Sequence, residues 1–71
     1  MDKRKLESIM KLHGDTGNDL AEYLGIARST FSLKLNENGT EFTQSEIAKI
    51  KNKYCLSAED VGNIFFETKV S

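Results

Sequence analysis

Two short helical patterns, separated by a single glycine, occupy positions 16–36 and constrain the fold more than any other part of the chain. Their apolar residues recur at helical spacing and are Leu20, Ala21 and Leu24 in the first pattern, and Phe31 and Leu35 in the second. Gly25 lies between them, where a glycine can adopt the left-handed conformation that ends a helix. Two helices joined by so short a turn cross steeply, so the sequence predicts a tight helical pair.

Three helix starts share one pattern, a Ser or Thr followed three residues later by an acidic residue. In this capping box each side chain accepts a hydrogen bond from the backbone N–H of the other residue. The pairs are Thr16 with Asp19, Thr43 with Glu46, and Ser57 with Asp60. With a further helix over residues 2–13 and another over residues 27–36, the sequence predicts five helices and an all-α fold.

The apolar stripes also predict which side chains face the core. The expected inner residues are Leu6, Ile9, Met10 and His13 in the first helix, Ile47, Ile50 and Tyr54 in the fourth, and Val61, Ile64 and Phe65 in the fifth. Asn38 or Gly39 should supply the left-handed residue after the third helix. Cys55 should be a small buried residue, with intermolecular pairing or redox sensing as alternatives. Phe66 either covers the edge of the core or belongs to a subunit interface.

Length and composition fit one small domain. The chain has 71 residues, of which 38% are hydrophobic and 30% charged, and it contains no proline. A chain of this length buries only about 60% of its unfolded surface, so we expect one domain over residues 1–71 with a frayed tail from about residue 67. No stretch approaches the ~18 apolar residues of a membrane span, and the charged first segment lacks the apolar run of a signal peptide. We therefore expect a cytoplasmic protein that does not enter a membrane.

Catalysis and metal binding have little support in the sequence. One histidine and one cysteine, far apart in the chain, do not form the spaced ligand pairs of a zinc site. No serine has the glycine-rich elbow, base and orienting group that a nucleophile requires. The GDTG segment at positions 14–17 lacks the preceding strand and following lysine of a phosphate-binding loop. We therefore expect a binding protein with no cofactor and no metal, and not an enzyme.

One face of the third helix could bind a macromolecule. If residues 27–36 are helical and bury Phe31 and Leu35, the ~100° step per residue turns the opposite side outward. That side carries Ser29, Thr30, Leu33 and Asn36, flanked by Arg28 and Ser32. Hydroxyl groups, a guanidinium and a leucine can all contact base edges in the major groove of DNA. The alternative is an ordinary solvent-facing surface.

Net charge argues against a strong nucleic-acid binder, because the chain carries a formal charge of −1. The distribution of charge matters more than the total. The basic residues form three groups, which are Lys3, Arg4 and Lys5, then Arg28 and Lys34, then Lys49, Lys51 and Lys53. The last group is expected on the outer face of the fourth helix, and all three groups could be plain solvated surface.

The run LAEYLGIARSTFSLKLN at positions 20–36 resembles the Cro and repressor-type (XRE-like) helix-turn-helix regulators of bacteria and their phages. Residues on positions that define the motif are Leu20, Ala21, Gly25, Ile26, Phe31 and Ser32. The segments EFTQSEIAKI and SAEDVGNIFF are similar to the small phage-type regulators of Gram-positive bacteria, so the resemblance spans nearly the whole chain. It implies a five-helix, lambda-repressor-like DNA-binding domain.

The resemblance also implies which residues contact DNA. Residues 27–36 would be the recognition helix, with Arg28, Ser29, Ser32 and Leu33 at base-reading positions and Asn36 where relatives touch phosphate. Gly17 departs from the pattern, because many relatives carry a phosphate-binding glutamine there, so Thr16, Asn18 or a backbone N–H would take that contact. Lys34 stands where many relatives have a bulky apolar residue. The candidate DNA-binding residues are Thr16, Asn18, Arg28, Ser29, Thr30, Ser32, Leu33, Lys34 and Asn36.

Together these features predict a sequence-specific transcriptional regulator of phage or prophage type, binding a two-fold operator in double-stranded DNA as a homodimer. The competing hypothesis is an antirepressor, or another protein-interaction module, that keeps the fold and binds a partner repressor. Four features favour this hypothesis, namely the near-neutral net charge, the outward Leu33, the absence of a side chain at Gly17 and the additional Phe66.

Overall fold

The structure is a computed structural model that describes residues 1–66, and over that range it is all-helical. Its five helices are α1 (Lys3–Leu12), α2 (Gly17–Leu24), α3 (Arg28–Leu35), α4 (Gln44–Tyr54) and α5 (Ala58–Phe65). The predicted five-helix, all-α class is therefore confirmed. The frayed tail predicted from about residue 67 lies outside the described residues.

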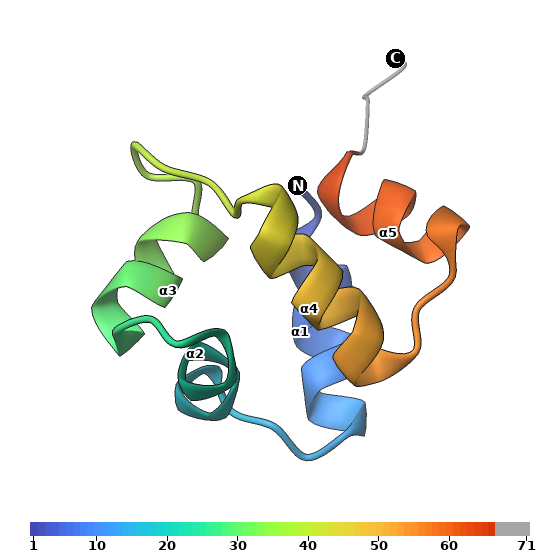
Figure 1. Ribbon diagram of the computed structural model, residues 1–71, viewed down its shortest axis with the longest axis horizontal. Helices are drawn as coiled ribbons and strands as arrows, with labels where there is room; N and C mark the ends of the chain where they lie inside the picture. The colour runs from blue at the N-terminus through green and yellow to red at the C-terminus, as the bar shows by residue number, and fades with distance from the viewer. Residues whose placement is uncertain (67–71) are drawn as a thin grey trace.

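The five helices surround one common core, and Figure 1 views them with α4 in front of α1. In this view α3 lies on one side of α4 and α5 on the other. The most extensive helix contact is between α2 and α3, while α5 packs on both α1 and α4. As a result α3 lies at one end of the molecule, with α2 as its main support.

Four of the five helices begin with a side-chain cap, and all three predicted capping boxes are present. The backbone N–H of Thr16 donates to Asp19 at 2.9 Å, and the N–H of Thr43 donates to Glu46 at the same distance. In α1 the side chain of Asp2 accepts from the N–H of Lys5. By contrast α3 starts at Ala27, which makes no side-chain cap hydrogen bond.

The apolar stripes meet in one core. Its buried residues are Leu6, Met10, Leu20, Ala21, Leu24, Phe31, Phe42, Ile50, Tyr54 and Ile64. The rings of Phe31 and Phe42 lie 5.7 Å apart, and those of Phe42 and Phe65 lie 6.0 Å apart. This chain of rings connects α3 to α5 through the loop residue Phe42, and each such pair contributes about 0.5–1.5 kcal/mol beyond its buried area.

The two turns that flank α3 differ in how well they were predicted. Gly25 has a φ of 74° and its N–H donates to Ala21 and Glu22 carbonyls, which closes α2 and sends the chain into α3. The prediction that Asn38 or Gly39 ends α3 is wrong, because the left-handed residue next to the cap residue Asn36 is Glu37, and Gly39, with a φ of 82°, follows two residues later. Glu37 has a φ of 51°, and the N–H of Asn38 after it donates to the Leu33 carbonyl.

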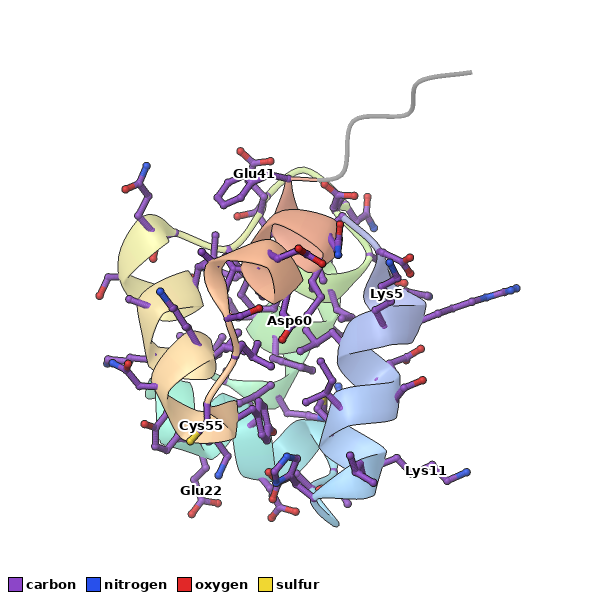
Figure 2. The ribbon with its side chains drawn as sticks, turned by 90° about the vertical axis from the view of Figure 1, so that its right-hand side faces the viewer. Lys5, Lys11, Glu22, Glu41, Cys55 and Asp60 are labelled. Carbon is purple, nitrogen blue, oxygen red and sulfur yellow. The ribbon has the colours of Figure 1, made fainter. Side chains whose placement is uncertain are left out.

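Three burial predictions are wrong. Cys55 is exposed, and it ends α4 with a φ of 52°, so its place at the helix terminus outweighs its apolar character. Figure 2 shows its sulfur at the surface near the end of α4. His13 is exposed because it lies at the C-terminal cap of α1, where it contacts the Tyr54 ring at 4.9 Å. Lys53 is drawn inward, since its ammonium lies 3.4 Å from Asp15 and over the Tyr23 ring.

Candidate nucleic-acid interface

The outward face of α3 contains most of the residues expected there. Arg28, Ser29, Leu33 and Asn36 are exposed, whereas Thr30 and Ser32 are half-buried at its edges. Phe31 is only 1% exposed and fixes the opposite side of the helix in the core. Leu33 is 44% exposed, so an apolar side chain stands in the middle of a polar face.

Arg28 connects the start of α3 to the start of α2. A Cβ placed on Gly17 would lie 3.1 Å from the Arg28 Cζ, so the guanidinium covers the α-carbon of that glycine. The Cζ also lies 5.9 Å from the centre of the Phe31 ring. The guanidinium therefore lies at the junction of the two helices, and Arg28 as a whole is exposed.

At the start of α2, Thr16 is occupied by the capping box. Its hydroxyl donates to Asp19 Oδ2 at 3.0 Å and accepts from the N–H of Asp19 at 3.2 Å. The backbone N–H and then the hydroxyl of Thr16 hold the pKa of Asp19 below its usual value, so this carboxylate stays charged near neutral pH. Negative charge beside Thr16 leaves the exposed Asn18 as the better phosphate ligand of the two.

Lys34 does not extend onto the outward face. Its ammonium lies 2.6 Å from Glu46 Oε1, and the two side chains are each only 11% exposed. Burial would raise the pKa of Glu46, but hydrogen bonds from Lys34 and from the N–H of Thr43 outweigh burial and hold that pKa below its usual value. The positive charge of Lys34 is thus neutralised inside the α3–α4 junction.

Asn36 and Lys3 lie together at the other end of the face. The Lys3 ammonium donates to Asn36 Oδ1 at 2.7 Å, and Asn36 Nδ2 donates to the Ser32 carbonyl at 2.9 Å. Lys3 is absent from the residues predicted for the site, although its place in the basic N-terminal group was a visible signal. Because its ammonium is exposed here, Lys3 can replace the charge that Lys34 does not supply.

Neither a metal site nor a membrane span is found within residues 1–66. That part of the chain has no group of three or more His, Cys, Asp or Glu side chains placed to hold a metal ion. None of its five helices is both long and apolar enough to cross a membrane.

Comparison of the chain with protein-family models, with curated proteins and with solved structures found no match.

Proposed function

We propose that this protein is a sequence-specific DNA-binding transcriptional regulator, in which α2 and α3 form a helix-turn-helix and α3 enters the major groove. The observation that carries the proposal is the exposed face of Arg28, Ser29 and Leu33 on a helix whose opposite side is locked by Phe31. The eight residues of α3 rise about 12 Å. A helix with its side chains is roughly 10–12 Å across, so α3 can enter a major groove roughly 12 Å wide.

Arg28, Ser29 and Leu33 could each make a different kind of contact with the DNA bases. The guanidinium can donate two parallel hydrogen bonds to a guanine, and the Ser29 hydroxyl can donate to or accept from any base edge. Leu33 can rest on a thymine methyl group. The position of α3 at one edge of the molecule supports this use (Figure 1).

The proposal includes a homodimer on a two-fold operator, with half-sites about one duplex turn apart. It places the chain in the cytoplasm of a bacterial or phage-infected cell, where it would act on phage or prophage promoters. Since the formal net charge is −1, we expect few phosphate contacts, weak binding to random duplex and a shallow dependence on salt.

The test is selection of duplexes from a random library, followed by titration of the best duplex with variants. Leu12 is 83% exposed on α1 and provides a matched control for Leu33. Leu33→Ala should weaken binding about fivefold, or ~1 kcal/mol, while Leu12→Ala should leave it unchanged. Ser29→Ala and the control Ser8→Ala form a second pair. If the wild-type chain enriches no duplex, the proposal is wrong.

A protein-interaction role is the second candidate, and one observation favours it. The charge of Lys34 is neutralised by Glu46, so the α3 face is less basic than the sequence indicates. Leu33 is exposed within the same face. Such a face could dock on a partner repressor. A complex with that repressor that resists added salt, together with no binding to duplex DNA, would support this alternative.

A further inference from the structure

Gly17 is the first residue of α2, and its backbone does not require a glycine. Left-handed φ values are found at Gly14, Gly25 and Gly39, and Gly17 is not among these residues. At an ordinary helical position alanine is favoured over glycine. A reason for glycine at this position must therefore come from its surroundings.

The neighbour that a side chain would meet is Arg28. A Cβ on Gly17 would lie 3.1 Å from Cζ and from one terminal nitrogen of Arg28, and 3.2 Å from Nε. These are closer than ordinary van der Waals contacts, so the guanidinium would have to move. Because Arg28 is exposed, it could move without disturbing the core.

We infer that Gly17 is a positioning residue, which fixes the direction of the Arg28 guanidinium and thereby sharpens base discrimination by the α3 face. The inference rests on the proposed DNA-binding function. The guanidinium lies against the backbone of Gly17, and its Cζ is 5.9 Å from the centre of the buried Phe31 ring. A planar donor held in one orientation loses less conformational freedom on binding than a freely rotating one.

The experiment is a double-mutant cycle with Gly17→Ala and Arg28→Ala, titrated against the selected duplex and against duplexes altered at single base pairs. Gly17→Ala should weaken binding to the selected duplex by about three- to tenfold. It should also reduce discrimination at the base pair that Arg28→Ala affects most. In the Arg28→Ala background the same change should have no effect.

A merely structural role for Gly17 would lower stability and weaken all duplexes alike. We expect neither, and we expect the slope of affinity against salt to stay unchanged because no charge is removed. The Nε–H resonance of Arg28 should shift in the Gly17→Ala protein without DNA. Gly62→Ala is the control, since a Cβ there meets nothing within 4 Å.

The outcomes separate the two proposals. If the wild-type chain selects a duplex and Gly17→Ala binds every tested duplex as the wild type does, the inference is overturned and the proposed function stands. An equal effect of Gly17→Ala with and without Arg28 would overturn it too. If the wild-type chain selects no duplex, both fall.

Discussion

Lys34 reaches from α3 to α4 and places its ammonium nitrogen 2.6 Å from Glu46 Oε1. The same oxygen accepts a hydrogen bond from the backbone N–H of Thr43 at 2.9 Å, within the capping box of α4. One carboxylate therefore fixes the start of α4 and connects it to α3. Because α3 has no side-chain cap of its own, this link is one of the few polar contacts that hold its position.

Removal of the charge on Glu46 should destabilise the fold. Glu46→Gln keeps an acceptor for the N–H of Thr43, but it leaves the Lys34 ammonium largely buried without a counter-charge. We expect the free energy of unfolding to fall by about 1–3 kcal/mol in urea denaturation. Lys49→Met, on the exposed side of α4, should change it by less than about 0.5 kcal/mol. Equal stability of Glu46→Gln and wild type would contradict a role for the ion pair.

The same carboxylate predicts a loss of stability in acid. The pKa of Glu46 is held below its usual value of 4.5 in the folded chain, and that of Asp19 is also lowered. Such groups stabilise the fold fully above their unfolded pKa values, and this contribution is lost as the pH falls through the folded values. Unfolding free energies measured between about pH 7 and pH 3 should therefore decline below about pH 4.5. Glu46→Gln should show a shallower decline, and an identical pH profile would count against this assignment.

Local chemistry explains why the helices could be predicted from the sequence. The capping boxes join residues three positions apart, so the pattern of Thr16 with Asp19 already contains the contact that the structure shows. The apolar stripes behave likewise, because the helical period alone decides which residues share a face. For the same reason the outward side of α3 was predictable once Phe31 was assigned to the core.

Contacts between helices could not be predicted in this way. Lys34 forms an ion pair with Glu46 in the next helix. The Arg28 guanidinium packs against the backbone of Gly17 in the preceding helix. Charged residues were expected in solvent because nothing in the neighbouring sequence reveals a distant partner. Cys55 was expected to be buried because of its residue type, but its left-handed position at the end of α4 places it at the surface.

Tyr54 supplies a test of one such distant contact. Its hydroxyl donates to Asp15 Oδ2 at 2.8 Å and ties α4 to the loop before α2. Burial first, and then the hydrogen bond to Asp15, raise the pKa of Tyr54. Tyr54→Phe keeps the ring beside His13 and should lower the free energy of unfolding by about 0.5–1.5 kcal/mol, measured by thermal or urea denaturation.

The control for this change is Tyr23→Phe. The Tyr23 side chain is 46% exposed, and its ring can still lie beneath the Lys53 ammonium when the hydroxyl is gone. We expect a change of less than about 0.5 kcal/mol. If the two variants lost the same stability, the hydrogen bond between Tyr54 and Asp15 would not be the cause.

Gly25 and Gly62 should respond to alanine in opposite directions. Gly25 ends α2 with a φ of 74°, whereas Gly62 lies within α5 without a left-handed φ. Gly25→Ala should lower the free energy of unfolding by about 1–2 kcal/mol, and Gly62→Ala should raise it by roughly 0.5–1 kcal/mol, both measured by urea denaturation. A Cβ at either position meets nothing within 4 Å, so a loss at Gly25 must come from the backbone and not from a steric clash. An unchanged stability for Gly25→Ala would mean that the turn presenting α3 does not depend on the left-handed residue.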